Sequence, residues 1–250
     1  MKHRYRHRHF NKQRASTSNG RPRTKLARPL VVRYGFIVRS LPDTRQPTGS
    51  LVFAPLVVPE VVPPDECVAL IAEMLASSPG PTPVLRSGLD RFEPTVRSSD
   101  SCTPSGPTAL KVLSRLESAA RQVWADTGTE PGDLSGAHYF RYREGGFVAP
   151  HRDRSVNNDD PREVRWRQLS LVLFLNSGEP PAGFDGGALV VYATHPQRPT
   201  SQHTLRAQTG ALALFDPGLV HEVTPVRSGT RYTVVTWLIE RDTTQPREIR

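Results

Sequence analysis

The feature that most constrains the fold is a series of six short β-type segments in the second half of the chain. Each is rich in β-branched or aromatic residues, and Gly, Pro or Asn residues separate them. They lie at residues 137–143, 168–176, 187–193, 203–208, 210–216 and 230–240. Because two helical segments precede them, this order predicts an antiparallel barrel or jelly roll that helices support on one side.

The two helical segments fall within residues 60–128. In the first, apolar residues recur at helical spacing from Cys67 to Leu75, and Asp65 is predicted to cap the helix. In the second, Gly128 follows the end, and one apolar face is predicted. That face comprises Leu110, Leu113, Leu116, Ala120, Val123 and Trp124. Residues 60–128 are therefore expected to form a helical support, with a loop at 97–107, and residues from about 135 to 240 the barrel core.

Positive charge is concentrated at the N-terminus. The net charge of the 250-residue chain is +9 at pH 7, and 12 of its 33 Lys and Arg residues precede the first acidic residue, Asp43. The opening residues show no hydrophobic periodicity, so residues 1–42 are predicted to form a basic, largely disordered arm, and residues 43–250 the folded domain. The arm has three candidate roles: a tether to nucleic acid or another anionic surface, an organelle transit peptide, or an incidental tail.

Composition also limits where the chain is expected to act. No apolar run approaches the roughly 18 to 20 residues that a membrane-spanning helix needs, so no membrane partner is predicted. The chain has two cysteines, Cys67 and Cys102, which form neither a disulfide framework nor a Cys-x-x-Cys zinc motif. These features favour a reducing, cytoplasmic location, with an N-terminal transit peptide as the alternative.

The stretch "APHRDRS" at residues 149–155 places His151 and Asp153 on the same side of an extended segment. A His and a carboxylate are two of three ligands for a metal, and His221 in "FDPGLVHEVTPV" is the best-placed third. Two His and one carboxylate leave coordination positions open, as in non-haem iron(II) oxygenases, whereas a closed zinc site usually has four protein ligands. Taken alone, the His-x-Asp triplet also fits a solvated surface pair.

Arg231 lies ten residues after His221, in a segment where it shares one face with Thr233, Val235 and Trp237. An inward-facing guanidinium needs an anion, and its planar fork suits a carboxylate. Arg231 and Thr233 are therefore candidates for binding a co-substrate. The alternative is a solvated, outward-facing arginine, or one that pairs with a nearby acidic residue.

Four stretches resemble the iron(II)- and 2-oxoglutarate-dependent dioxygenases of the prolyl 4-hydroxylase type. They are "YREGGFVAPHRD", "LSLVLFLN", "FDGGALVVY" and "GALALFDPGLVHEVTPVRSGTRYTVVTW". The likeness covers about residues 137–240, and "VVPPDECVALIAEML" resembles that family's helix before the barrel. It implies a mainly β fold with flanking helices around a double-stranded β-helix, the jelly-roll or cupin-like core.

The resemblance also implies an activity and a role for each site residue. His151, Asp153 and His221 would hold Fe(2+), Arg231 would bind the distal carboxylate of 2-oxoglutarate, and Tyr142 would also contact this co-substrate. Many prolyl hydroxylases of this type have Lys where Arg231 stands, while other relatives have Arg. The implied reaction hydroxylates a C–H bond with O2 and releases succinate and CO2, with ascorbate as reductant.

The substrate class implied is an amino acid, a prolyl or peptidyl group, or another small molecule. Residues 154–168 are charged and rich in turn formers, so they are predicted to form a loop over the barrel mouth that contacts substrate. Trp166 in this loop is either a substrate contact or a packing residue. His138, His195 and His203 are predicted to be ordinary strand or loop histidines.

Two further interpretations stay open. Residues 1–42 could recruit the oxygenase to nucleic acid or to the ribosome through counterion release. Alternatively, the barrel could be a non-catalytic binding module. Gly186 and Gly187 are predicted to allow close backbone approach or a bulge, or else to form an ordinary turn.

Overall fold

The computed structural model describes most of the chain from residue 55 to residue 241. The described ranges are 38–39, 51–52, 55–86, 88–125, 127, 130–179, 183–195 and 198–241. Except for strand β1 (Val38–Arg39), which pairs with β2 (Leu51–Val52), the predicted arm at residues 1–42 lies outside them, as does Gly128. Within these ranges no helix has both the length and the apolar character that a membrane crossing would require.

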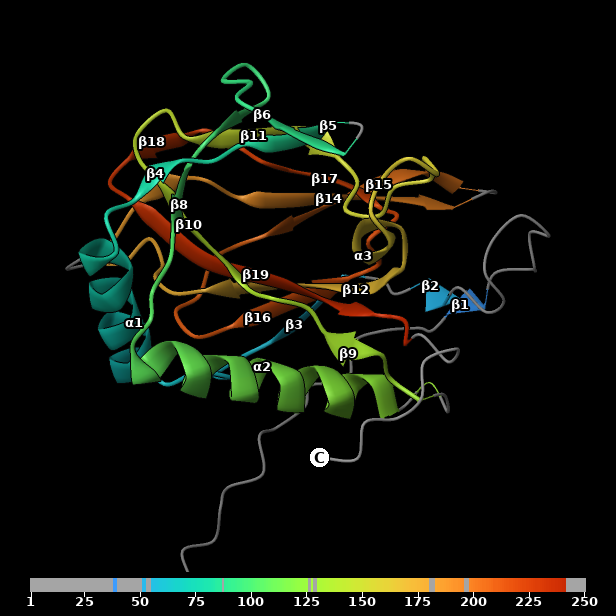
Figure 1. Ribbon diagram of the computed structural model, residues 1–250, viewed down its shortest axis with the longest axis horizontal. Helices are drawn as coiled ribbons and strands as arrows, with labels where there is room; N and C mark the ends of the chain where they lie inside the picture. Colours follow the sequence, from blue (N-terminus) through green and yellow to red (C-terminus); the bar gives the residue numbers. More distant parts are fainter. Residues whose placement is uncertain are drawn as a thin grey trace, which may run out of the picture. The chain divides into compact units, whose positions relative to one another are not determined.

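Two antiparallel sheets form the centre of the fold. The larger has the order β3 (Leu56–Val58), β16 (Leu212–Phe215), β12 (Arg167–Phe174), β19 (Arg231–Ile239), β10 (His138–Tyr142), β8 (Asp100–Cys102) and β4 (Gly80–Pro81), and β9 (Asp133–Leu134) also pairs with β19. The smaller has the order β15 (Arg198–Leu205), β14 (Leu189–His195), β17 (Val220–Val223), β11 (Phe147–His151) and β7 (Arg97–Ser98). Figure 1 shows the smaller sheet above the larger one, with helix α2 (Pro107–Ala125) running below. This arrangement confirms the predicted double-stranded β-helix with flanking helices.

Two short two-stranded sheets lie at the edges of this barrel. Strand β13 (Asp185–Gly186) pairs with β18 (Val226–Ser228), and β5 (Val84–Arg86) pairs with β6 (Leu89–Arg91). A short helix, α3 (Arg162–Arg165), lies within the charged segment at residues 154–168. This segment therefore contains one helical turn in addition to the predicted loop.

Strand β12 shows how one sequence pattern builds two hydrophobic cores. Its side chains alternate between the faces of the sheet. Leu169, Leu171 and Leu173 pack against helices α1 (Pro64–Ala76) and α2, whereas Val172 and Phe174 pack between the sheets. Because both faces are covered, the strand is apolar from Leu169 to Phe174 apart from Ser170.

Packing changed two details of the predicted helices. Pro63 is the N-cap residue of α1 and no side chain caps the helix, so the prediction for Asp65 is wrong; Asp65 lies in the first turn, where its charge suits the helix dipole. Leu110 is 72% exposed and therefore not on the buried face of α2. That face instead comprises Ala109, Val112, Leu116, Ala120 and Trp124.

The stretch 97–107, predicted to be a loop, contains strands β7 and β8. Both are short and rich in Ser, Asp and Arg, which have no strong β propensity. Strand β7 pairs with β11, and β8 pairs with β10, so each sheet gains a strand from this stretch. Hydrogen bonds to neighbours already in place, rather than local propensity, therefore define these two strands.

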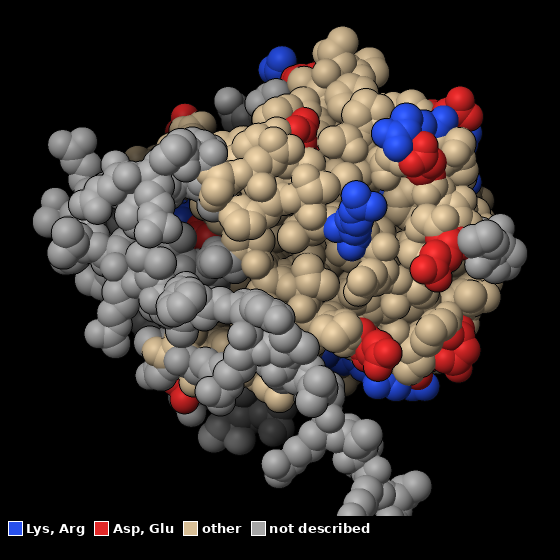
Figure 2. All heavy atoms as spheres, turned by 180° about the vertical axis from the view of Figure 1, so that it is seen from behind, with Lys and Arg blue, Asp and Glu red and all other residues tan. Residues whose placement is uncertain are grey.

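Charged residues of both signs are interspersed on the folded part of the chain. Figure 2 shows that the described surface of its rear face is largely uncharged, with basic and acidic side chains side by side toward its edge. From Asp43 onward the chain has 21 basic and 24 acidic residues. The positive net charge of the protein therefore comes from the residues that precede Asp43.

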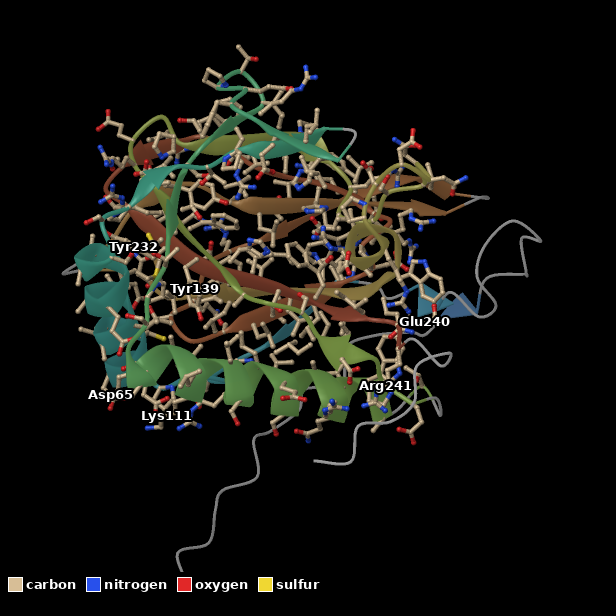
Figure 3. The ribbon with its side chains drawn as sticks, viewed as in Figure 1. Asp65, Lys111, Tyr139, Tyr232, Glu240 and Arg241 are labelled. Atoms are coloured by element: carbon tan, nitrogen blue, oxygen red, sulfur yellow. The ribbon has the colours of Figure 1, made fainter. Side chains whose placement is uncertain are left out.

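A charged cluster joins the start of α1 to α2. The Glu66 carboxylate accepts hydrogen bonds from Nε and Nη2 of Arg115, both at 2.8 Å, and Nζ of Lys111 lies 2.7 Å from Glu66 Oε1. Figure 3 shows Lys111 beside Asp65 at this corner of the molecule. The cluster thus connects two helices that also share the core beneath them.

Candidate active site

The structure brings His151, Asp153 and His221 together. His151 ends β11 and lies directly opposite His221 of β17, because the two residues are register partners. Oδ1 of Asp153 lies 3.6 Å from Nε2 of His151 and 3.5 Å from Nε2 of His221. Ligand atoms that bind one ion at about 2.0 to 2.2 Å stand about 3 to 3.5 Å apart, so the three residues form a site that can hold a metal ion.

Backbone carbonyl groups orient both imidazole rings. Nδ1 of His151 lies 3.0 Å from the carbonyl oxygen of Ala149, and Nδ1 of His221 lies 3.0 Å from that of Leu219. A carbonyl oxygen can only accept, so each Nδ1 must carry the hydrogen. In the neutral ring Nε2 is then left with a free lone pair, as a metal ligand requires.

Ser170 orients the carboxylate in the same way. Its hydroxyl donates a 2.7 Å hydrogen bond to Oδ2 of Asp153, which leaves Oδ1 facing the two imidazoles. The backbone of Asp153 is also held, since its N–H donates to the carbonyl of Pro217 and its own carbonyl accepts from Nη1 of Arg167. Ser170 was not among the residues predicted from the sequence, although a lone serine in the otherwise apolar run 169–175 was an available signal.

Burial and charge act against each other on the ionisable groups of this site. Burial raises the pKa of Asp153, but the neighbouring His221 and His151 outweigh this effect and hold the pKa well below its usual range. Burial lowers the pKa of His221, but Asp153 more than offsets this and raises it. The Asp153 carboxylate is therefore negatively charged. A bound metal cation would take the place of the second proton that this charge favours on the His221 imidazole.

Arg231 lies on β19, opposite Tyr142 of β10, and only 1% of its surface is exposed. Its guanidinium carbon lies 4.8 Å from the centre of the Tyr142 ring and 5.6 Å from that of Phe174. None of its three nitrogens meets a hydrogen-bond acceptor among the described residues. Burial lowers the pKa of Arg231, and the Tyr142 phenol partly offsets this. Arg231 is therefore not solvated, and no acidic side chain among the described residues pairs with it.

Thr233, like Arg231, is buried without a hydrogen-bond partner. It is fully buried, and its hydroxyl has no partner among the described residues. Isolated buried charges are strongly unfavourable, and an unpaired hydroxyl is also costly. A guanidinium and a hydroxyl without acceptors on one face of β19 together form a site suited to a carboxylate.

Gly187 is required next to this arginine. Its φ of +57° is in the left-handed region, and an added Cβ would lie 2.9 Å from Cδ of Arg231. The neighbouring Gly186 pairs with Val226 where the register shifts. The glycine pair therefore combines the predicted bulge with close backbone approach.

His138 was predicted to be an ordinary histidine, and Trp166 to be either a substrate contact or a packing residue. His138 lies on the interior face of β10, and its ring centre is 5.2 Å from that of Trp237. Trp166 lies under the guanidinium of Arg162 at 4.1 Å, which supports the packing interpretation. His203 is exposed on β15, as predicted for an ordinary histidine.

A pocket of about 550 Å³ lies elsewhere, along β7, β8 and the end of β10. It is lined by Arg97, Asp100, Arg141 and Arg143 among others, and none of the three metal-site residues contributes to it. Because neither the triad nor Arg231 and Thr233 line this pocket, the proposed chemistry is assigned to the barrel interior around those residues.

Comparison with known proteins agrees with this geometry. Residues 137–239 match the model of the 2OG-Fe(II) oxygenase superfamily. A PKHD-type hydroxylase of Shewanella baltica is 32% identical over 100 residues, which are 40% of this chain and 41% of that protein. One of Cupriavidus pinatubonensis is 33% identical over 111 residues, 43% of this chain and 45% of that protein. The chain thus matches less than half the length of these relatives.

Solved structures share the fold over a longer stretch. A prolyl-4-hydroxylase of Pseudomonas putida has a TM-score of 0.58 at 21% identity and covers 75% of this chain and 93% of its own. A prolyl hydroxylase of Trichoplax adhaerens, in complex with a hypoxia inducible factor peptide fragment, has a TM-score of 0.57 at 14% identity. The match covers 74% of this chain and 83% of that one. Its triad, its matched segment and its barrel therefore make residues 137–239 of this chain similar to the 2OG-Fe(II) oxygenase superfamily.

Proposed function

We propose that the protein is an iron(II)- and 2-oxoglutarate-dependent hydroxylase that oxidises a C–H bond of an amino-acid, prolyl or peptidyl substrate. The observation that carries this proposal is the pairing of two features in one barrel. A metal site has three oriented ligand atoms, and Arg231 is a buried cation that lacks an anion. A generic metal-binding barrel would need the first feature and not the second.

The residues present fit both groups that this chemistry needs. His151, Asp153 and His221 would hold the iron through Nε2, Oδ1 and Nε2. Arg231 and Thr233 would bind the distal carboxylate of 2-oxoglutarate, and Tyr142 beside them would complete this end of the site. With iron(II), 2-oxoglutarate and O2 bound, the site would supply an oxidant for an unactivated C–H bond and release succinate and CO2.

The contribution of the protein is then mainly to orient the reactants and exclude water. Asp153, His221, Arg231 and Thr233 are all buried, so charge interactions within the site are weakly screened. Phe215 packs edge-on to His221 with ring centres 4.7 Å apart and covers one side of the metal site. Ascorbate is proposed as the reductant that restores iron(II). The peptide bound to the Trichoplax adhaerens relative supports a peptidyl substrate.

The proposal is tested by succinate formation from 2-oxoglutarate. The purified full chain would be supplied with iron(II), ascorbate, O2 and 2-oxoglutarate, without and with mixtures of candidate peptides and amino acids. We expect iron-dependent succinate, and a mass increase of one oxygen in a hydroxylated substrate. Asp153→Asn removes the charge of the ligand set and should abolish both, while Asp133→Asn changes the same group at an exposed ion pair and should not.

The result that would overturn the proposal is a wild-type protein that binds neither a divalent metal nor 2-oxoglutarate, as measured by calorimetry. Equal succinate formation by Asp153→Asn and wild type would remove Asp153 from the ligand set. A non-catalytic binding module would bind the metal and show no turnover with any candidate substrate.

A second role rests on the basic N-terminal segment. Twelve Lys and Arg residues precede Asp43. We propose that this segment binds nucleic acid or another anionic polymer, while the barrel carries out the hydroxylation. Deletion of residues 1–30 should lower a salt-sensitive affinity for such polymers and leave succinate formation nearly unchanged. An affinity that does not change on deletion would contradict this role.

A further inference from the structure

A second cluster of side chains lies beside the candidate active site, and the proposed reaction does not use it. It comprises Arg97 of β7, His138 and Phe140 of β10, Arg167 of β12 and Trp237 of β19. The guanidinium carbon of Arg97 lies 4.0 Å from the Phe140 ring centre, and that of Arg167 lies 3.4 Å from the Trp237 ring centre. The His138 ring links the two, at 6.0 Å from Phe140 and 5.2 Å from Trp237. We call these five residues the cationic cluster.

The cationic cluster is next to the metal site. Trp237 is the register partner of Ser170, the serine that donates to Asp153. Nη1 of Arg167 donates a 2.8 Å hydrogen bond to the backbone carbonyl of Asp153. A molecule held by the cationic cluster would therefore present its neighbouring atoms to the metal.

No acidic side chain among the described residues forms an ion pair with the arginines of this cluster. Arg97 donates to the hydroxyl of Ser99 and Arg167 to a carbonyl. Burial lowers the pKa of His138, and the charges of Arg167 and Arg97 lower it further, while Asp153 opposes them. Asp153, the carboxylate whose charge acts on both His138 and Arg167, is already committed to the metal site.

Two buried donors of the cluster also lack acceptors. Trp237 is 7% exposed, and neither its Nε1 nor Nε of Arg167 has a hydrogen-bond partner among the described residues. The His138 ring packs against Phe140 and Trp237 but keeps part of its surface exposed, so the cluster opens to solvent at that residue. Unpaired donors and uncompensated positive charge at an accessible point favour an anionic ligand with acceptor oxygens.

We propose that the cationic cluster binds a carboxylate of the substrate, so that the protein acts on a molecule with a free carboxylate close to the oxidised carbon. This inference deepens the proposed function and rests on it. A free amino acid and the C-terminal residue of a peptide both offer this chemistry. An internal residue of a neutral peptide does not.

Binding of matched acids and amides tests the inference directly. The full chain would be loaded with manganese(II) and saturated with 2-oxoglutarate, so that the first carboxylate site is filled, and then titrated in a calorimeter. The probes are proline and prolinamide, N-acetylproline and its amide, and an Ala-Pro dipeptide and its amide. At least one acid should bind about tenfold or more tightly than its amide, as one charge-assisted hydrogen bond would give.

The pairs also distinguish the two sources of the carboxylate. Preference for proline alone would indicate a free amino acid, and preference for the dipeptide would indicate a C-terminal residue. If no acid binds more tightly than its amide, or if no probe binds, the inference is wrong. A protein that does not bind 2-oxoglutarate in the loading step would instead overturn the proposed function, and this inference with it.

Variants assign the preference to the cluster. Arg97→Gln removes one charge, and Trp237→Phe removes one N–H donor while it keeps an aromatic ring. Arg97→Gln should reduce the ratio of acid affinity to amide affinity about tenfold or more. Trp237→Phe should reduce this ratio severalfold. Arg121→Gln makes the same charge change in an exposed pair on α2 and should leave the ratio unchanged. An unchanged ratio in Arg97→Gln would place the carboxylate elsewhere, even if Trp237→Phe failed to fold.

Discussion

His151 and His221 lie opposite each other on antiparallel strands β11 and β17, with their ring centres 4.2 Å apart. Strands thus bring together two imidazoles that are 70 positions apart in the sequence. The carbonyls of Ala149 and Leu219 lie two residues before each ring and bind Nδ1 in the same way. Both rings therefore present Nε2 to the same point, which Asp153 faces from the following turn.

The first prediction concerns the serine behind this carboxylate. Ser170→Ala removes the donor to Oδ2 of Asp153, so the carboxylate can rotate away from the imidazoles. We expect the affinity for manganese(II) or iron(II) to fall by about 10- to 100-fold, as for other groups that orient metal ligands. Calorimetric titration measures this, with circular dichroism as the check on folding. Ser228→Ala, at an exposed serine on β18, should bind metal as the wild type does.

Arg231 should determine the affinity for 2-oxoglutarate rather than for metal. Its guanidinium is buried without an acceptor, so binding of a carboxylate there should contribute about 1.5 to 3 kcal/mol. Arg231→Ala should raise the KM for 2-oxoglutarate about tenfold or more. Arg231→Lys should have a milder effect, since it keeps the charge and loses the fork. Initial-rate kinetics measure both, and loss of metal binding in Arg231→Ala would show that Arg231 supports the fold instead.

Thr233 gives a prediction with opposite effects on stability and binding. Its buried hydroxyl has no partner in the described part of the protein, so Thr233→Val replaces a costly polar group with a methyl group of similar size. Without co-substrate, the free energy of unfolding should rise by about 1 kcal/mol. Affinity for 2-oxoglutarate should fall severalfold. Urea unfolding measures the change in stability, and calorimetry measures the affinity for 2-oxoglutarate. A destabilised variant that binds 2-oxoglutarate normally would contradict both expectations.

The Glu66 cluster predicts how stability depends on pH. The hydrogen bond from Arg115 holds the pKa of Glu66 below its ordinary value of 4.5; burial opposes this, and Lys111 assists it. A carboxyl group whose pKa is lower in the folded state stabilises the fold above the unfolded pKa, and this stability is lost as pH falls through the folded pKa.

Glu66→Gln should therefore lower the free energy of unfolding by about 1 kcal/mol or less near pH 7. The difference from wild type should shrink below about pH 4. Urea unfolding at both pH values measures it. Glu117→Gln disrupts the exposed i,i+4 pair with Arg121 and should have a smaller effect at either pH. A difference between Glu66→Gln and wild type that grows toward low pH would contradict the assignment.

Much of the fold followed from local sequence patterns. The β-branched and aromatic residues of β12 and β19 predicted strands, and the helical spacing from Cys67 to Leu75 predicted α1. The spacing of His151 and Asp153 placed two candidate ligands on one side of the chain. These features depend on neighbours within a few residues, so local physics determines them.

Other features were decided only by tertiary structure. Strands β7 and β8 exist because edges of both sheets were available for pairing, and the buried side of α2 was set by its packing, which left Leu110 in solvent. Likewise, Ser170 and Asp153 meet because β12 passes behind the metal site. Arg97, 41 positions before His138, reaches the same interior face only through β7. The sequence by itself determined which residues could form strands, helices and ligands; the pairing of distant strands decided which of them meet, because contacts between distant segments depend on the closed barrel.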